Sequence, residues 1–325
     1  MVDVPLFADV EEAAVRIAPY AVRTPLVESP LLGVLRGGRV FLKLESLQRT
    51  GSFKFRGAAN RILMIPQDQR AAGVVAFSSG NHAQAVAAMA QILGIPALIV
   101  MPADAPKAKI DGTRAFGAEI VPYDRMRDDR EAIAARICEE RGATLIKPYD
   151  DPQIIAGQGT AGLEIAEDAA RLGAALDAVA VPCSGGGLVS GIALALKGAG
   201  VAAFVHSVEP ENFDGMRRSL AAHARSTAPG GKLSIADALM APTPGHHVFA
   251  VADGLLAPGL TVSDAELTRA VAFAATRLKL LVEPGGAAAL AAYLAGKIQA
   301  KTVALVISGG NADFATVANA VAESP

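Results

Sequence analysis

A lysine flanked by two phenylalanines lies in the segment RTGSFKFRGAANR, residues 49–61. Burial of Lys54 beside aromatic rings would lower its pKa, because desolvation penalises the charged ammonium form. The neutral amine would be a nucleophile that can form a Schiff base with an aldehyde. Taken alone, the same letters also fit an ordinary exposed lysine on an alternating strand. Lys54 is therefore a candidate catalytic residue whose assignment depends on what the fold places beside it.

Three polar turns, each following a predicted strand, offer groups that could bind a ligand. They are FSSGNHAQ (77–84), PCSGGGLVSG (182–191) and VISGGNAD (306–313). Ligands of open parallel sheets bind at the carboxyl ends of the strands, where these turns should lie. Free amides at a helix N-terminus suit a carboxylate in the first turn and a phosphate in the glycine-rich second turn. The hydroxyl of Ser308 in the third turn could hydrogen-bond a ring nitrogen.

Each turn also has a plainer interpretation. Ser and Asn are common helix caps, and consecutive glycines can simply form a tight turn. The glycine spacing matches neither the Walker pattern nor G-x-G-x-x-G, so the usual nucleotide motifs are not met. The turns become informative only when they are considered together and with Lys54.

The elements that would position these residues alternate between short apolar runs and helical periodicity, which predicts an α/β fold with parallel sheets. We expect two doubly wound parallel-sheet domains. The small domain spans 71–147, and the large domain is discontinuous, with residues 1–70 and 148–325. The predicted strands are 25–29, 39–45, 74–77, 96–101, 119–123, 144–149, 177–183, 204–209 and 302–308. The irregular stretch 225–247 either lines the site as an ordered loop or is a surface excursion.

The composition narrows the class of partner. The chain has 325 residues, 52% of them hydrophobic and 5% aromatic, and a formal net charge of −2. Balanced charge without a basic block predicts no nucleic-acid partner and favours a small-molecule ligand. No signal peptide, membrane-length apolar run or cysteine framework is evident, since Cys138 and Cys183 follow no metal spacing. We expect a cytoplasmic protein that does not enter a membrane.

Six segments, in this order along the chain, carry a resemblance to a known family: SFKFRG, SSGNHAQ, IAGQGT, SGGGL, VEP and SGGN. Together they resemble the fold type II pyridoxal-phosphate enzymes, specifically the serine/threonine dehydratase and serine racemase family. The resemblance implies a tryptophan synthase beta-like fold, pyridoxal 5'-phosphate in the interdomain cleft, an amino-acid substrate and a homodimer.

The resemblance also implies a role for each matching residue toward the cofactor. Lys54 would hold the cofactor as a Schiff base, and Phe53 would pack near its ring. Asn81 would hydrogen-bond the ring hydroxyl, and Ser308 would meet the pyridine nitrogen. A neutral serine there goes with elimination more than with transamination. The phosphate would be held by Ser184, Gly185, Gly186, Gly187 and Leu188.

On the substrate side, the resemblance places a ring of polar residues around the amino-acid carboxylate, namely Ser78, Ser79, Asn81 and His82. Ser79 would also exchange a proton on the face opposite Lys54, as in racemases. Arg130 matches an arginine that contacts a second substrate carboxylate in some relatives, although it could equally pair with Asp128 or Asp129 on a helix surface.

The family's divalent-metal site is only partly matched. Glu209 and the carbonyl of Phe213 correspond to two of its ligands, but the acidic position is Gly215, with Asp214 just before it. We expect Mg²⁺ or another divalent cation only if Asp214 or water replaces the missing ligand.

The reaction that the resemblance implies is the elimination of water from L-threonine, L-serine or a related 3-hydroxy amino acid, which gives a 2-oxo acid and ammonia. Lys54 would remove the Cα proton as general base. A serine racemase or a 3-hydroxyaspartate dehydratase using the same site is the alternative. A nucleotide-binding redox protein or a non-catalytic binding module is a more remote one.

Overall fold

The computed structural model describes residues 2–105 and 107–323. Its larger sheet has six strands in the order β1-β2-β10-β7-β8-β9. Strands β2, β10, β7, β8 and β9 run parallel, and β1 pairs antiparallel with β2 at one edge. Their bounds are β1 Leu26–Glu28, β2 Arg39–Leu44, β7 Ala178–Pro182, β8 Phe204–Pro210, β9 Leu260–Val262 and β10 Thr302–Ile307.

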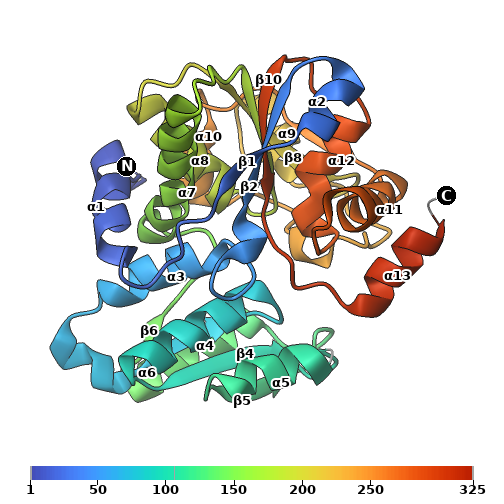
Figure 1. The fold of residues 1–325 in the computed structure, drawn as a ribbon. Coiled ribbons are helices and arrows are strands. Elements are labelled where there is room, and N and C mark those ends of the chain that lie inside the picture. Colours follow the sequence, from blue (N-terminus) through green and yellow to red (C-terminus); the bar gives the residue numbers. More distant parts are fainter. Residues whose placement is uncertain (1, 106, 324–325) are drawn as a thin grey trace.

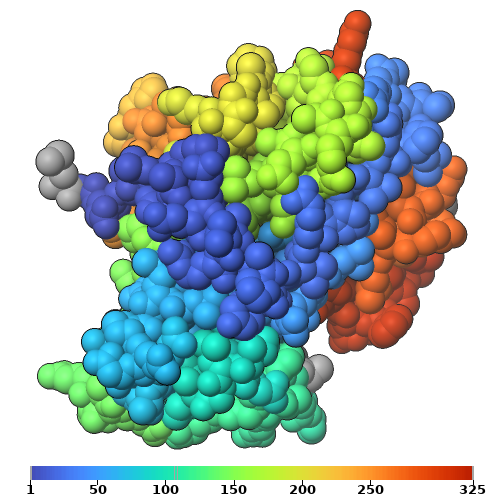
Figure 2. All heavy atoms as spheres, turned by 60° about the vertical axis from the view of Figure 1, so that its left-hand side comes forward, coloured from blue at the N-terminus to red at the C-terminus, as the bar shows by residue number. Residues whose placement is uncertain are grey.

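A smaller, parallel sheet has four strands in the order β5-β4-β3-β6. Its strands are β3 Val74–Phe77, β4 Ala97–Pro102, β5 Glu119–Tyr123 and β6 Thr144–Leu145. Figure 1 shows this sheet, with α4, α5 and α6, below the larger one. In the space-filling view the residues of the smaller sheet lie in a distinct lower lobe, and the N-terminal segment crosses the visible face of the molecule above that lobe (Figure 2).

Helices cover both faces of the larger sheet because its central strands are apolar on both sides. Along β10, Val303, Leu305 and Ile307 join one core cluster, while Ala304 and Val306 join another, as the two-residue period of a strand requires. Helices α11 and α12 lie on the first face and α7 and α8 on the second (Figure 1).

The helices have the following bounds: α1 Phe7–Ile17, α2 Pro30–Arg36, α3 Lys54–Leu63, α4 Asn81–Leu93, α5 Lys107–Ala115, α6 Arg130–Arg141, α7 Pro152–Arg171, α8 Gly187–Gly198, α9 Gly215–Ala222, α10 His246–Ala252, α11 Asp264–Phe273, α12 Ala288–Leu294 and α13 Phe314–Glu323. A π-helical turn at Ala274–Leu278 follows α11. Among the described helices, none is both long enough and apolar enough to cross a membrane.

The predicted α/β fold with parallel sheets is confirmed, and the strands predicted at 74–77 and 119–123 coincide with β3 and β5. The short edge strand β9 was not predicted. Lys54 does not lie on a strand, because it is the first residue of α3. Phe55 and Ile62 of α3 belong to the core of the smaller sheet, so the domain boundary near residue 70 stays a prediction.

Candidate active site

Lys54 lies at the start of α3 with its side chain directed into the protein. Its Nζ donates a hydrogen bond to the carbonyl oxygen of Pro148 at 2.6 Å, and it lies 5.2 Å from the ring centre of Phe53. Burial lowers the pKa of Lys54 from its usual 10.5 to about 8, because within the described part of the chain no carboxylate offsets the desolvation of the ammonium. Near neutral pH a much larger fraction of this amine is therefore in the neutral, nucleophilic form than for an exposed lysine.

The chain before Lys54 runs against the end of β10, which brings Ser308 close to the lysine. The N–H of Phe53 donates to the carbonyl of Ser308 at 3.1 Å, and Ser52 forms an isolated bridge with Gly309. Ser308 is buried. Lys54 and Ser308 are 254 positions apart in the sequence, but the segment that precedes Lys54 lies beside Ser308 at the carboxyl end of β10.

Helix α4 begins beside this edge without a side-chain cap. Its N-cap is Gly80, whose N–H donates to the Oγ of Ser78 at 3.2 Å. The plainer interpretation of this turn, in which Ser or Asn caps the helix, is therefore wrong. Ser79 is half-buried in the same turn. Uncapped N–H groups at a helix N-terminus form a binding site for an anion, which supports the predicted carboxylate site.

His82 lies one residue inside α4 and is buried. Its Nε2 lies 2.9 Å from the carbonyl oxygen of Ile146, so Nε2 must carry the proton of the neutral ring. Burial, and then the charge of Lys54, lower the pKa of His82 to about 3. His82 therefore provides a neutral imidazole and no positive charge for a substrate carboxylate.

Asn81 is held by two residues that the sequence analysis missed. Its Nδ2 donates to Glu283 Oε1 at 2.6 Å, and its Oδ1 accepts from Asn311 Nδ2 at 2.8 Å. Burial raises the pKa of Glu283 to about 7. These contacts fix the orientation of the amide and leave one Nδ2 proton for a ligand. The available signal was a second VEP sequence at 282–284, inside an apolar and glycine-rich stretch.

The glycine turn after β7 forms a cradle with no space for side chains. A Cβ at Gly185 would lie 2.4 Å from the Tyr149 ring, and one at Gly186 would lie 2.5 Å from Met216 Cε. Gly186 has φ +94° and is the N-cap of α8, which begins at Gly187 with no side-chain cap. The free amides of this buried turn fit a phosphate.

The remaining residues of that turn close the cradle from the other side. Ser184 Oγ accepts a hydrogen bond from the N–H of Ala241 at 3.1 Å, and the N–H of Gly245 donates to the carbonyl of Gly185 at 3.3 Å. Leu188 is buried in α8. Of the two interpretations of 225–247, the ordered loop is confirmed, because its second half packs on the cradle. An ion pair of 2.5 Å between Lys109 and Asp237 also links this loop to α5.

Arg130 begins α6, where its side chain is exposed and its guanidinium lies 5.4 Å from the ring centre of Phe77. Among the ion pairs of the described residues, none involves Arg130, so the predicted pairing with Asp128 or Asp129 is not found. Phe77 ends β3, immediately before the turn that opens α4. Arg130 therefore lies near the turn that opens α4, without a carboxylate partner among the described residues.

The predicted metal residues come together but are engaged otherwise. Glu209 accepts hydrogen bonds from the N–H groups of Met216 and Arg217, both at 2.8 Å. Burial raises the pKa of Glu209 to about 8. Phe213 is buried beside them.

Asp214 departs furthest from the predicted metal set. It forms ion pairs with Arg217 and Arg218. In the described part of the chain, no group of three or more His, Cys, Asp or Glu side chains has the arrangement of a metal site. Asp214 is thus the member that the geometry disfavours, and the cation site of Glu209, Phe213 and Asp214 stays a prediction.

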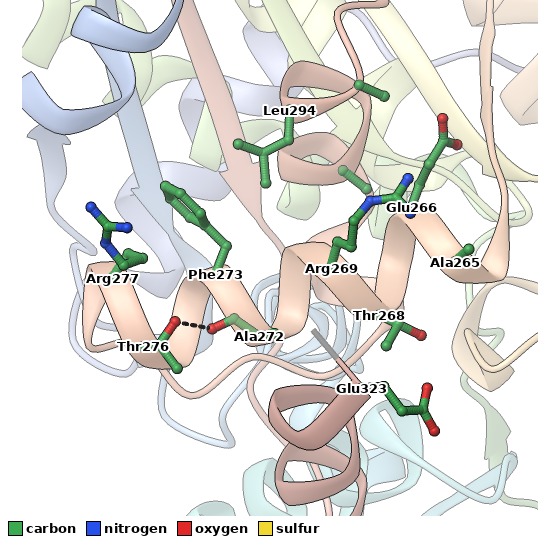
Figure 3. Close-up of a pocket in the computed structure, with 12 residues that line it drawn as sticks. Ala265, Glu266, Thr268, Arg269, Ala272, Phe273, Thr276, Arg277, Leu294 and Glu323 are labelled. Atoms are coloured by element: carbon green, nitrogen blue, oxygen red, sulfur yellow. Dashed lines mark hydrogen bonds between the residues drawn. The ribbon is translucent and has the colours of Figure 1, made fainter. Parts of the chain in front are cut away.

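A surface groove of about 930 Å³ lies away from these turns, along α11 and α12. Figure 3 shows Phe273 and Leu294 on its apolar side and Arg269 and Arg277 at its rim. It contains none of the predicted site residues. The candidate site is therefore defined by the strand-end turns and not by the size of a cavity.

Comparisons with known proteins agree with this site. The model of the family described as "Pyridoxal-phosphate dependent enzyme" matches residues 17–309. An L-threo-3-hydroxyaspartate ammonia-lyase from a Pseudomonas species is 43% identical over 314 residues, covering 95% of this chain and 96% of the relative. A serine racemase from Schizosaccharomyces pombe is 42% identical over 316 residues, with 95% of each chain covered.

Solved structures show the same fold. The crystal structure of a threonine deaminase from T.th. has a TM-score of 0.90 and 44% identity, covering 95% of this chain and 99% of the other. The structure of maize serine racemase has a TM-score of 0.92 and 36% identity, covering 99% and 98%. The uncapped glycine cradle, the desolvated Lys54 amine and the buried Ser308 suit the phosphate, aldehyde and ring nitrogen of one cofactor. The chain belongs to the family of pyridoxal-phosphate dependent enzymes.

Proposed function

We propose that this chain is a pyridoxal-phosphate dependent ammonia-lyase that removes water from a 3-hydroxy amino acid and releases a 2-oxo acid and ammonia. The observation that carries the proposal is the desolvated amine of Lys54, on a segment whose backbone bonds to Ser308 at the carboxyl end of β10. Names of relatives that are 39–43% identical, including L-threonine ammonia-lyase and L-threo-3-hydroxyaspartate ammonia-lyase, support it.

The protein's residues divide the work as follows. Lys54 and Ser308 would hold the aldehyde and ring-nitrogen ends of the cofactor, Asn81 its ring hydroxyl, and the segment 184–188 its phosphate. Pyridoxal phosphate supplies an electron sink that acidifies the Cα–H bond of an amino acid. Ser308 is an uncharged hydrogen-bond partner and does not stabilise a fully protonated ring, which favours elimination.

When it is free of the cofactor aldehyde, the amine of Lys54 would act as the general base that removes the Cα proton of the substrate. A pKa of about 8 suits this role, because a base is most effective when its pKa lies near the working pH. The carbonyl of Pro148 orients the amine through the 2.6 Å hydrogen bond. The free N–H groups of the turn before α4 bind the substrate carboxylate, and the Ser79 hydroxyl offers a proton donor for racemisation as a side reaction.

Arg130 favours 3-hydroxyaspartate as a second candidate substrate. It is a cation beside the substrate turn with no carboxylate partner among the described residues, and a second carboxylate on the substrate would provide one. Two relatives, 43% and 40% identical, are named L-threo-3-hydroxyaspartate ammonia-lyases. This candidate shares Lys54 and the cradle with the main proposal and differs only in the β-substituent.

A substrate panel tests both forms of the proposal. Holoenzyme is given L-serine, L-threonine and L-threo-3-hydroxyaspartate, and 2-oxo acid, ammonia and D-amino acid are measured. Lys54→Ala should abolish every product. Arg130→Met should raise the KM for 3-hydroxyaspartate at least about tenfold and change that for serine less than threefold, whereas Arg136→Met, an exposed arginine of the same helix, should change neither. A D-amino acid without any 2-oxo acid would refute elimination and leave a racemase.

Balanced charge and a small-molecule site support a cytoplasmic enzyme with no nucleic-acid partner. The apolar side of the groove along α11 and α12 supports a homodimer, as predicted from the resemblance. Light scattering coupled to size-exclusion chromatography tests the oligomeric state, and a monomeric holoenzyme would exclude the dimer.

A further inference from the structure

Arg56, two residues after Lys54, is buried, and the hydrogen-bond partners of its side chain lie outside α3. It makes paired contacts with two carboxylates: Nε and Nη2 donate to Glu45 at 2.8 and 2.9 Å, and Nη1 and Nη2 donate to Glu164, both at 2.8 Å. Glu45 directly follows β2, and Glu164 lies on α7. Arg56 therefore ties the lysine helix to the larger sheet and to α7 at once.

The cluster around Arg56 is charge-balanced and largely buried, with only Glu164 partly exposed. Lys43 is fully buried and donates to Glu164 at 2.5 Å and to the carbonyl of Thr24 at 2.7 Å. Two cations thus face two carboxylates. Burial works to raise the pKa of Glu45, but the charge and hydrogen bonds of Arg56, the charge of Lys43 and the hydrogen bond from Thr24 together outweigh it, so the net shift is downward. A buried pair of this kind tolerates little change in geometry, since a lost contact leaves a charge without a partner.

Successive residues of α3 point to three different parts of the protein, because each residue of a helix is rotated by about 100° from the one before it. Lys54 reaches the site and Phe55 enters the core of the smaller sheet. Arg56 reaches the larger sheet. Rotation of α3 about its axis would break at least two of these contacts. The position of the Lys54 amine is thus linked to the contacts of Arg56.

The segment IAGQGT, residues 155–160 of α7, forms the surface on which α3 packs. We call this contact the joint of α3 with α7. A Cβ at Gly157 would lie 2.7 Å from the Cα of Gly57, so the backbones of α3 and α7 are in direct contact. Thr160 accepts from Arg56 Nη1 at 3.1 Å.

Helix α7 also packs closely on α8. A Cβ at Gly159, two residues after Gly157, would lie 2.9 Å from the carbonyl oxygen of Gly191 on α8. Helix α7 is therefore the spacer between α3, which begins with Lys54, and α8, which begins at the phosphate cradle.

We infer that Arg56 is a positioning residue, which holds Lys54 at a fixed distance from the phosphate cradle through the joint of α3 with α7. The inference rests on the proposed roles of Lys54 and of the segment 184–188. A cofactor has a rigid ring between its aldehyde and its phosphate, so a lysine that is displaced relative to the cradle meets the aldehyde less often.

The test compares two aldehydes on apoprotein. Pyridoxal phosphate and pyridoxal, which lacks the phosphate, are each added, the product is trapped with borohydride, and labelling of Lys54 is timed by peptide mass. In the wild type, anchoring of the phosphate should make labelling at least about 100-fold faster with pyridoxal phosphate than with pyridoxal. Arg56→Lys keeps the charge but loses the planar fork, and should reduce this ratio at least about tenfold while leaving the pyridoxal rate within about threefold.

Arg61→Lys is the matched control. Arg61 lies on the same helix and pairs with Asp151 at the N-terminus of α7 at 3.2 Å, but its side chain is 27% exposed. For Arg61→Lys, the ratio of the labelling rates with pyridoxal phosphate and pyridoxal should stay within about twofold of the wild-type ratio, because partly exposed ion pairs contribute little to holding a structure in place. A change confined to stability would alter the melting temperature but not the ratio of the two rates.

An Arg56→Lys protein with native circular dichroism and the wild-type ratio would overturn the inference. If that variant does not fold, Glu164→Gln replaces it, since it keeps the shape of the side chain and removes one charge, and an unchanged ratio there is equally contrary. A wild type in which pyridoxal phosphate does not label Lys54 faster than pyridoxal would overturn the proposed cofactor roles and this inference with them. A wild type that labels as expected, with an unchanged variant, removes only the inference.

Discussion

Replacing Lys54 by methionine should make the apoprotein more stable at neutral pH while abolishing activity. The folded protein lowers the pKa of this lysine from 10.5 to about 8, so at pH 7 it carries a charged amine in a desolvated position. The corresponding cost is at most about 3 kcal/mol, at about 1.4 kcal/mol for each tenfold change in the protonation equilibrium. Methionine has a similar length and no charge, and it does not carry this cost.

The sign of the pH dependence separates this effect from any other result of the substitution. Because the folded pKa lies below the unfolded one, the cost is fully present below pH 8 and disappears as the pH rises toward 10.5. Between pH 7 and pH 9.5 the free energy of unfolding of the wild type should therefore rise by about 2 kcal/mol relative to that of the variant. The lost hydrogen bond to Pro148, worth about 1 kcal/mol, shifts the whole curve but not its slope.

Urea denaturation of both apoproteins at pH 7, 8, 9 and 9.5 measures this difference. Lys147→Met, at an exposed lysine beside Pro148, controls for the loss of one positive charge. A difference between wild type and Lys54→Met that stays constant over this range would show that the amine is not desolvated, and would remove the physical basis for its role as a base.

Three further substitutions separate the roles of neighbouring residues. Gly186→Ala places a Cβ 2.5 Å from Met216 Cε at φ +94°, and should raise the Kd of pyridoxal phosphate at least about tenfold in an absorbance titration. Glu283→Gln keeps an acceptor for Asn81 and removes a carboxylate whose pKa burial raises from 4.5 to about 7. Because that carboxylate disfavours folding once it ionises, the free energy of unfolding of the variant should rise relative to that of the wild type by up to about 2.5 kcal/mol from pH 5 to pH 8, measured by denaturation. Ser79→Ala should reduce racemisation at least about 100-fold, by chiral chromatography, and leave 2-oxo acid formation within about fivefold.

The sequence predicts the strand-end turns well because their signals are local. Four apolar residues between Gly73 and Ser78 fix β3 at both ends. The glycine run predicts the cradle, since no other residue type leaves amides so accessible. In each case the information lies within about ten neighbouring positions.

Contacts between distant segments could not be predicted in this way. The bond from Asn81 to Glu283 joins residues 202 positions apart, and the bond from Arg56 to Glu164 joins residues 108 apart. Single-sequence periodicity carries no information about which helix faces which. The burial of Arg56 is also contrary to the usual preference of arginine for the surface, and it becomes intelligible only with both carboxylates in place.

Desolvation acts on Lys54, His82 and Glu283 in the same direction, toward the neutral form. The pKa of Lys54 falls to about 8, that of His82 falls to about 3, and that of Glu283 rises to about 7. The positive potential for a substrate carboxylate must then come from the uncapped amides before α4, which do not titrate. Binding of the carboxylate should accordingly be insensitive to His82 between pH 5 and pH 8. Of these three groups, Lys54, as it loses its proton, and Glu283, through its hydrogen bond to Asn81, are the two that titrate in or near that range.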